Sequence, residues 1–220
     1  MKYSVILLIA GKGSRCNLDY NKVFFELNNK PLFLYALDVF LKDKKCNEII
    51  IVYNQNDLNT LNEYLKEYTD SRIKLAIGGK ERQNSVLNGL MLVTSEYVLV
   101  HDGARANINQ KLIDKVLNGF KESDVVSLGL NVTDTIKKVS EKIETVNRNN
   151  LYFVQTPQGA KTNVLIRCIQ KANDDDVLVT DDLMAVELYS DIVPKIVLGE
   201  KSNIKVTTQD DLSLLKYYME

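Results

Sequence analysis

The chain has a single histidine, His101, and three cysteines, Cys16, Cys46 and Cys168, among its 220 residues. A Ser-His-Asp hydrolase would have to use that one imidazole. Because His101 ends an apolar strand-like segment, a structural role is favoured over general-base catalysis. The cysteines are odd in number and lack the spacing of a disulfide framework or a zinc site. This cysteine usage predicts a protein of the reducing cytoplasm.

Long apolar runs and an excess of one charge are also absent. No run reaches the roughly 18 apolar residues of a membrane-spanning helix, and no signal-peptide pattern precedes the first strand-like segment. The formal net charge is −1 at pH 7, so no global basic field indicates a nucleic-acid partner. Any anion site must therefore come from a local cluster of cations. The length and the absence of repeats predict one domain over residues 1–220.

Strand-like and helix-like segments alternate along the chain. The strand-like segments are residues 5–10, 48–53, 73–77, 97–101, 125–130 and 193–198. The segments with helical periodicity are residues 32–41, 58–68, 85–93, 110–121, 164–172, 182–188 and 212–219. This alternation predicts an α/β fold, a Rossmann-like three-layer sandwich whose mostly parallel sheet has helices on both faces.

Residues 133–157 interrupt the alternation. They are rich in β-prone residues and contain no helical stretch, so we expect a β-arm that leaves the sheet, with 136–139 and 151–155 paired as two strands. The apolar side chains Leu151, Tyr152 and Phe153 favour packing on a second subunit. The alternative is a hairpin that lies over its own core.

Glycines and cations follow the first strand-like segment. Gly11 and Gly13 would let backbone amides approach a phosphate, and Arg15 and Lys22 would add positive charge. Ligands of open α/β sheets bind beyond the carboxyl ends of such strands. The segment lacks the Gly-Lys-Ser/Thr of a P-loop, and Cys16 occupies the third glycine position of the dinucleotide fingerprint. The alternative is a tight turn with solvated surface cations.

Two further segments precede helix-like stretches. Gly78 and Gly79 come before the stretch that contains Ser85, and their amides could form a second anion or base-edge site; an ordinary loop is the alternative. Residues 180–182, Thr-Asp-Asp, are interpreted as the N-cap of the helix that follows.

Charged residues follow the strand-like segment 97–101 and recur near the end of the chain. Asp102 is placed to ligate Mg²⁺ on a phosphate, and Arg105 to bind a second phosphate. A weak surface pair between them is the alternative. Lys205 alternates with Ile204 and Val206, so it is either a solvated edge residue or a third site cation.

Together these motifs resemble the 2-C-methyl-D-erythritol 4-phosphate cytidylyltransferase family of the non-mevalonate isoprenoid pathway. The resemblance runs nearly end to end, and the order and spacing of the motifs make it specific. The matching segments are IAGKGSR with Lys22, GGKERQNSVLNGL at 78–90, LVHDGAR at 99–105, VTDTIK at 132–137, QTPQ at 155–158, TDD at 180–182 and NIKVTTQDDL at 203–212.

The resemblance implies a nucleotidyltransferase fold, Mg²⁺, and a homodimer joined through the β-arm. It implies in-line attack of the polyol phosphate on the α-phosphorus of CTP. A phosphate monoester is already a nucleophile, so no strong general base is needed. The residues implied for catalysis are Arg15, Lys22 and Lys205. Those implied for CTP binding are Ala10, Gly11, Gly13, Gly78, Gly79, Arg82, Ser85, Asp102 and Gly103. Those implied for the polyol phosphate are Asp102, Arg105, Thr135, Arg148 and Thr156, with Asp102 also the metal ligand.

The sequence departs from the family pattern at four places. Asn21 and Ala106 replace prolines, Gly159-Ala160 replaces an aromatic residue, and Cys16 replaces methionine. We expect a less rigid loop around Lys22 and softer packing at the other positions.

Three rival functions share parts of this pattern. A ribitol 5-phosphate cytidylyltransferase would share the fold and CTP site, but Ala104 and Leu183 favour the methylerythritol family. A non-catalytic nucleotide-binding relative would not need Arg15, Lys22, Asp102 and Lys205 together. A sugar-1-phosphate nucleotidyltransferase for another base is disfavoured by residues 78–90.

Overall fold

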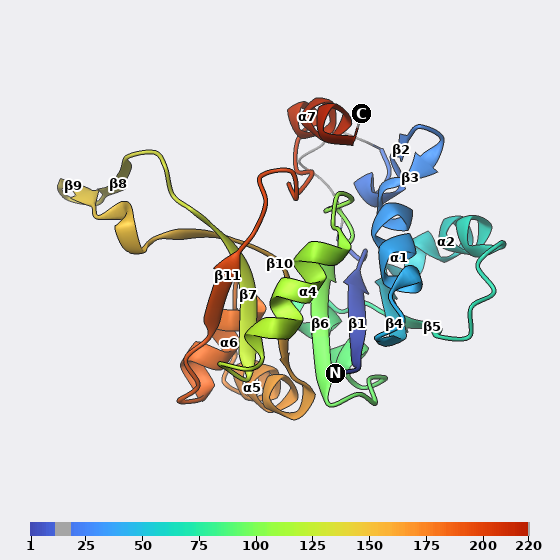
Figure 1. The fold of residues 1–220 in the computed structure, drawn as a ribbon, viewed down its shortest axis with the longest axis horizontal. Helices are drawn as coiled ribbons and strands as arrows, with labels where there is room; N and C mark the ends of the chain where they lie inside the picture. Colours follow the sequence, from blue (N-terminus) through green and yellow to red (C-terminus); the bar gives the residue numbers. More distant parts are fainter. Residues whose placement is uncertain (12–18, 220) are drawn as a thin grey trace.

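The computed structural model describes residues 1–11 and 19–219. Its centre is a seven-stranded sheet in the order β11-β7-β10-β6-β1-β4-β5 (Figure 1). Neighbouring strands are parallel except for β10, which runs antiparallel to β6 and β7. The predicted, mostly parallel sheet is therefore confirmed. The strands are β1 (Tyr3–Leu8), β4 (Cys46–Tyr53), β5 (Ile73–Ile77), β6 (Tyr97–Asp102), β7 (Val125–Asn131), β10 (Tyr152–Lys161) and β11 (Lys195–Leu198).

Helices cover both faces of this sheet. One face carries α1 (Leu32–Lys42), α2 (Leu58–Leu65) and α4 (Gln110–Gly119), and the other carries α3 (Arg82–Leu90), α5 (Thr162–Asp174) and α6 (Asp182–Tyr189). Side chains of a strand alternate between faces. Val5 and Leu7 of β1 accordingly pack in one apolar cluster and Ile6 in the other, all fully buried. Such two-sided burial is expected of a central parallel strand.

Shorter elements connect these layers. They are η2 (Lys22–Phe24), β2 (Glu26–Leu27), β3 (Lys30–Pro31), η3 (Gln55–Asp57), β8 (Ile136–Val139), β9 (Ile143–Val146), η4 (Arg148–Asn150) and α7 (Gln209–Met219). α7 packs on a small third cluster that includes Leu32, Ala106 and Val206. Among the described residues, no helix has the length and apolar character needed to cross a membrane.

Side-chain hydrogen bonds cap the starts of α6 and α7. Asp181 accepts a hydrogen bond from the Met184 N–H at 2.9 Å, so the N-cap predicted within 180–182 is confirmed. Before α7, the N–H of Thr208 donates to Asp211 at 2.8 Å. This contact is the returning half of a capping box, in which the third helical residue binds the N-cap amide.

The predicted pairing of residues 136–139 with 151–155 is wrong. β8 pairs instead with β9, and 152–155 belong to β10 of the central sheet. Two features explain the error. A hairpin partner close in sequence has a small loop-closure cost. In addition, β10 begins with exposed residues and is buried only from Gln155 onward, so its first half resembles a surface strand. The β8–β9 hairpin projects from the body of the molecule (Figure 1).

The packing is close at two of the positions where the sequence departs from the family pattern. A Cβ on Gly159 would lie 2.8 Å from both Leu99 Cδ2 and Phe120 Cζ, so those side chains fill the space beside the glycine. Ala106 is 2% exposed. The softer packing expected at Gly159 is therefore not observed, and Ala106 is buried.

Candidate active site

A cavity of about 460 Å³ opens at the carboxyl edge of the parallel strands. Its wall is formed by the end of β1, the residue after β4, the loop between β5 and α3, the end of β6 and the segment before α7. Strand ends of an α/β sheet present backbone amides and side chains to one place. The fold thus brings together motifs from residue 8 to residue 205 of the chain.

The predicted site residues divide into four groups by their place in the structure. Those that line the cavity are Ala10, Gly11, Lys22, Gly79, Arg82, Ser85, Asp102 and Lys205. Those packed beside it are Gly78, Gly103, Arg105 and Thr156. Thr135 and Arg148 lie at the projecting hairpin instead. Gly13 and Arg15 lie outside the described residues.

The glycine pair after β5 permits close contact between neighbouring backbone segments. A Cβ on Gly78 would lie 2.5 Å from the Ala10 Cβ, and one on Gly79 would lie 2.3 Å from the Asn84 Cβ. The Gly79 N–H donates to the Ser85 hydroxyl at 3.0 Å. Ser85 therefore shapes this loop by an internal hydrogen bond. A side chain at 78 or 79 would force this loop or its neighbours to shift.

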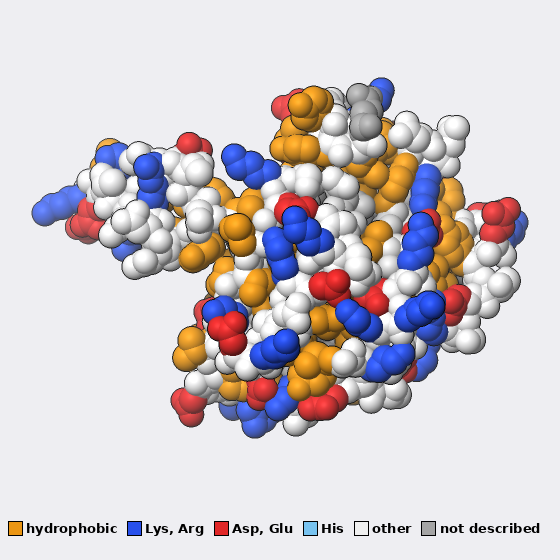
Figure 2. Space-filling model, in the orientation of Figure 1, with side chains coloured by type: hydrophobic (Ala, Val, Ile, Leu, Met, Phe, Trp, Pro, Cys, Tyr) orange, Lys and Arg blue, Asp and Glu red, His pale blue; other side chains and the backbone are white. Residues whose placement is uncertain are grey.

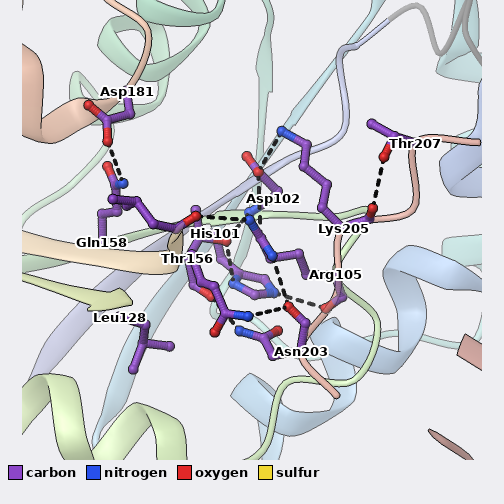
Figure 3. A network of polar contacts seen from close by, with 12 residues as sticks. His101, Asp102, Arg105, Leu128, Thr156, Gln158, Asp181, Asn203, Lys205 and Thr207 are labelled. Carbon is purple, nitrogen blue, oxygen red and sulfur yellow. Dashed lines mark hydrogen bonds and ion pairs between the residues drawn. The ribbon is translucent and has the colours of Figure 1, made fainter. Parts of the chain in front are cut away.

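Asp102 is the centre of a charged cluster at the end of β6. Its carboxylate lies 2.8 Å from Lys205 Nζ, 3.7 Å from Arg82 Nε and 3.9 Å from Arg105 Nε. Figure 3 shows Lys205 and Arg105 directed toward this carboxylate from different segments. Burial alone would raise the pKa of Asp102, but the charges of Arg82, Lys205 and Arg105 outweigh burial and hold the pKa well below its ordinary value. Asp102 is therefore ionised, and Lys205 is paired with it at the cavity wall.

An ion pair that the sequence did not reveal joins Arg82 to Asp182. The two guanidinium nitrogens Nη1 and Nη2 donate to the two carboxylate oxygens at 2.9 and 2.8 Å. Burial would lower the pKa of Arg82, but Asp182 and Asp102 together raise it above its ordinary value. The partners are 100 residues apart in the chain. The Thr-Asp-Asp motif pointed only to a helix cap, which Asp181 provides.

Gln158 holds the Asp181–Asp182 segment in place. Its side-chain amide donates to Asp181 at 3.0 Å (Figure 3). Its Oε1 accepts from the Asp182 N–H at 2.9 Å. β10 therefore fixes the start of α6, and through Asp182 it fixes the guanidinium of Arg82.

His101 is a structural residue, as predicted. Its ring is fully buried and both ring nitrogens are hydrogen-bonded. A carbonyl oxygen can only accept, so Nε2 donates to the Arg105 carbonyl at 3.1 Å, and Nδ1 accepts from the Thr156 hydroxyl at 3.1 Å. Burial lowers the pKa of His101 to about 4, so the ring is neutral at pH 7. It has no free lone pair with which to act as a base.

Thr156 and Arg105 form hydrogen bonds within the protein, although Arg105 Nε has no hydrogen-bond partner among the described residues. The Thr156 hydroxyl accepts from the Asp102 N–H at 3.1 Å, besides its bond to His101. Arg105 Nη1 donates to the Asn203 carbonyl at 2.8 Å, and burial lowers the pKa of Arg105. Asn203 in turn donates to the Thr156 carbonyl at 2.9 Å. This network ties the segment that carries Lys205 to β6 and β10.

The carboxylates suit a metal only in part. Within residues 1–11 and 19–219, no group of three or more His, Cys, Asp or Glu side chains could enclose a metal ion. Asp102 offers one ionised carboxylate at the cavity wall. Mg²⁺ commonly takes one or two carboxylates and completes its shell with water and substrate phosphates. The donor set therefore fits Mg²⁺ that is held jointly with a bound phosphate.

The predicted arm residues flank the β8–β9 hairpin, Thr135 before β8 and Arg148 after β9. Arg148 Nη1 donates to the Thr133 carbonyl, and Thr135 is exposed beside it. Tyr152 and Phe153 are 43% and 52% exposed. Figure 2 shows apolar side chains gathered where the hairpin leaves the body. Neither Thr135 nor Arg148 lines the cavity of its own chain.

Comparison with known proteins identifies the family. A family model described as 2-C-methyl-D-erythritol 4-phosphate cytidylyltransferase matches residues 3–220. The chain belongs to this family. Two curated members of this cytidylyltransferase family are similar over nine-tenths or more of their length. The protein of Clostridium botulinum (strain Okra / Type B1) is 37% identical over 100% of this chain and 98% of its own length. The protein of Alkaliphilus metalliredigens is 41% identical over 96% of this chain and 90% of its own length.

Solved structures of the same cytidylyltransferase family share this fold. The 4-diphosphocytidyl-2C-methyl-D-erythritol synthase of Anaerococcus prevotii superposes with a TM-score of 0.89 at 30% identity, covering 99% of this chain and 96% of its own. The cytidylyltransferase of Francisella tularensis superposes with a TM-score of 0.83 at 28% identity, covering 99% of this chain and 100% of its own. The nucleotidyltransferase fold predicted from the sequence motifs is thereby confirmed.

Proposed function

We propose that this protein transfers the cytidylyl group of CTP to the phosphate of 2-C-methyl-D-erythritol 4-phosphate. The products are 4-diphosphocytidyl-2-C-methyl-D-erythritol and pyrophosphate. One observation carries the proposal beyond family membership: Lys22, Asp102 and Lys205 line a single cavity at the strand ends, next to the loop of Gly79 and Ser85. That cavity would offer cations to the phosphates and the loop of Gly79 and Ser85 to the base.

The chain's own residues support a mechanism of positioning and charge stabilisation. The polyol phosphate attacks the α-phosphorus in line, and pyrophosphate leaves. Lys22 and Lys205 would stabilise negative charge on the equatorial oxygens, joined by Arg15 from the segment outside the described residues. His101 is buried, neutral and fully bonded, so it holds the Arg105 backbone rather than moving a proton.

Asp102 is the residue that would hold Mg²⁺ together with the CTP phosphates. Bound there, the ion would neutralise phosphate charge and screen the leaving pyrophosphate. The position of Asp102 between Lys205 and Arg105 would keep its carboxylate directed at the cavity before substrate binds. Buried free thiols at Cys46 and Cys168 fit the proposal of a cytoplasmic enzyme.

We further propose a homodimer in which the β8–β9 hairpin and η4 of one chain complete the polyol-phosphate site of the other. Thr135 and Arg148 lie away from the cavity of their own chain. The exposed Val139 and Ile143, at 72% and 70%, supply apolar area for such a contact. Mixing inactive Arg148→Ala and Lys205→Ala subunits tests this arrangement. Random pairing would restore about a quarter of wild-type activity if sites are shared; sites completed within one chain would give none.

Pyrophosphate release with CTP and Mg²⁺ tests the reaction itself. 2-C-Methyl-D-erythritol 4-phosphate and ribitol 5-phosphate are offered separately. We expect release with the methylerythritol substrate alone. Release mainly with ribitol 5-phosphate would preserve the CTP site and overturn the polyol assignment. CTP binding without release from either substrate would indicate a non-catalytic relative.

A further inference from the structure

Asn21 stands directly before Lys22, where the family pattern has proline. Its backbone angles are φ −65° and ψ 120°. A proline ring fixes φ near −65°. The chain therefore adopts, without a ring, the backbone conformation that proline would impose. Some other interaction must hold it there.

The Asn21 side chain supplies that interaction through three hydrogen bonds. Its Nδ2 donates to the Ile9 carbonyl at 2.7 Å and to Asp57 Oδ2 at 2.9 Å. Its Oδ1 accepts from the Val23 N–H at 3.4 Å. The side chain thus connects the end of β1, the end of η3 and the turn η2 that carries Lys22. Asn21 is 7% exposed, so a lost partner would leave a buried amide group unsatisfied.

These contacts converge on the cavity. Ile9, Asn21, Lys22 and Val23 all belong to its wall, whereas Asp57 lies behind them. A displacement of about 1 Å in a group that acts on the transition state can lower a rate about 100-fold. The Asn21 contacts are therefore placed to control the position of the Lys22 backbone relative to the nucleotide.

We propose that Asn21 is a positioning residue for Lys22 and that Asp57 is its anchor. The carboxamide achieves by hydrogen bonding what the family proline achieves by restricting φ. This inference rests on the proposed role of Lys22 in CTP binding and catalysis. It reverses the sequence-based expectation that Asn21 leaves the Lys22 loop less rigid.

The test measures kcat and KM for CTP in single and combined variants. We expect Asn21→Ala to lower kcat/KM for CTP about tenfold and Asp57→Ala to lower it by a smaller factor. The double variant should be no worse than Asn21→Ala, because both changes remove one connection. Asn21→Pro should rescue most of the activity that alanine loses. In the Asn21→Pro background, Asp57→Ala should have no further effect.

Asn109 provides a matched control for simple loss of stability. It also accepts from a backbone N–H, that of Leu112 at 3.0 Å, and donates to a carboxylate, Glu200 at 2.8 Å. It does not line the cavity. Asn109→Ala should lower the melting temperature as Asn21→Ala does, with no comparable fall in kcat/KM for CTP. An equal fall in both variants at equal loss of melting temperature would reduce Asn21 to a structural residue.

Two further outcomes separate this inference from the proposed function. If Lys22→Ala retains wild-type activity, the proposed role of Lys22 is wrong. If Lys22→Ala is inactive while Asn21→Ala matches wild type, only the positioning inference is overturned. If Asn21→Ala fails to fold, the effect of Asp57→Ala on kcat/KM for CTP can still be compared between the wild-type and Asn21→Pro backgrounds. An equal loss in both backgrounds would refute the coupling.

Discussion

Removing the Asp182 carboxylate should destabilise the fold because it leaves Arg82 without its main partner. Asp182 is 4% exposed and accepts two hydrogen bonds from the guanidinium. Truncating one member of a buried pair costs about 3–5 kcal/mol. The Arg82 side chain is 27% exposed and also has Asp102 at 3.7 Å. We therefore expect Asp182→Ala to cost about 3 kcal/mol, at the lower end of that range.

Urea denaturation and thermal unfolding measure this loss. For a chain of this size, a cost of about 3 kcal/mol lowers the melting temperature by roughly 6–12 °C. Asp175→Ala is the control, because Asp175 pairs with Lys171 on the surface of α5 at 2.8 Å. An exposed pair of this kind contributes little, so the control should melt with the wild type.

A double variant separates the unpaired charge from other effects of the substitution. Arg82→Met/Asp182→Leu removes both charges and keeps apolar volume, so it should recover most of the stability lost in Asp182→Ala. The reasoning is refuted if Asp182→Ala costs less than about 1 kcal/mol. It is equally refuted if the double variant is no more stable than Asp182→Ala.

Three other predictions follow from single sites. Burial opposes ionisation of Glu48, but bonds from Lys74, Ser4 and the Thr94 N–H outweigh it and lower the pKa from 4.5 to about 2. The ionised Glu48 stabilises the fold by about 3 kcal/mol at most. This stabilisation is present above pH 4.5 and is lost as pH falls through about 2. Glu48→Gln should flatten the plot of unfolding free energy against pH in this range, and an unchanged plot would contradict the assignment. Arg148→Ala should raise KM for the polyol phosphate and leave CTP binding intact, as titration calorimetry with CTP would show; equal loss of both would remove Arg148 from the polyol site. Lys205→Met should lower kcat about 100-fold, and a fall of less than about threefold would contradict its role at the α-phosphate.

The parts of the fold that could be predicted are those fixed by local pattern. The apolar run before Gly11 is a buried strand because a central parallel strand needs apolar side chains on both faces. The lone histidine was assigned a structural role because it ends such a strand. Asp102 and Lys205 were placed in one site from their motifs, and their 2.8 Å ion pair confirms that they meet.

The contacts that escaped prediction join segments that are distant in the chain. Nothing in the spacing of Arg82 and Asp182 indicates that they touch, because their meeting depends on where β10 places the start of α6. The position of β10 was itself missed, since its exposed first half hides the buried second half. The sequence predicted a less rigid loop at Asn21 because the proline ring is missing. Its hydrogen bond to Asp57 could not be predicted, because it depends on η3 lying beside the end of β1.

The charges around Asp102 show how the cavity can attract an anion while its cations stay close together. Arg82, Arg105 and Lys205 would repel one another strongly in a partly buried site if nothing lay between them. Asp102 lies within 4 Å of all three, and Asp182 forms a second ion pair with Arg82. These three cations and two carboxylates leave one net positive charge at the strand ends. Lys205, Arg82 and Asp102 all line the cavity. Among the described residues, Lys205 has its ion pair with Asp102, whereas Arg82 and Arg105 also bind Asp182 and the Asn203 carbonyl. In the proposed mechanism, Lys205 would exchange Asp102 for a phosphate while the rest of the cluster keeps its positions, which is the preorganisation that electrostatic stabilisation of a transferred group requires.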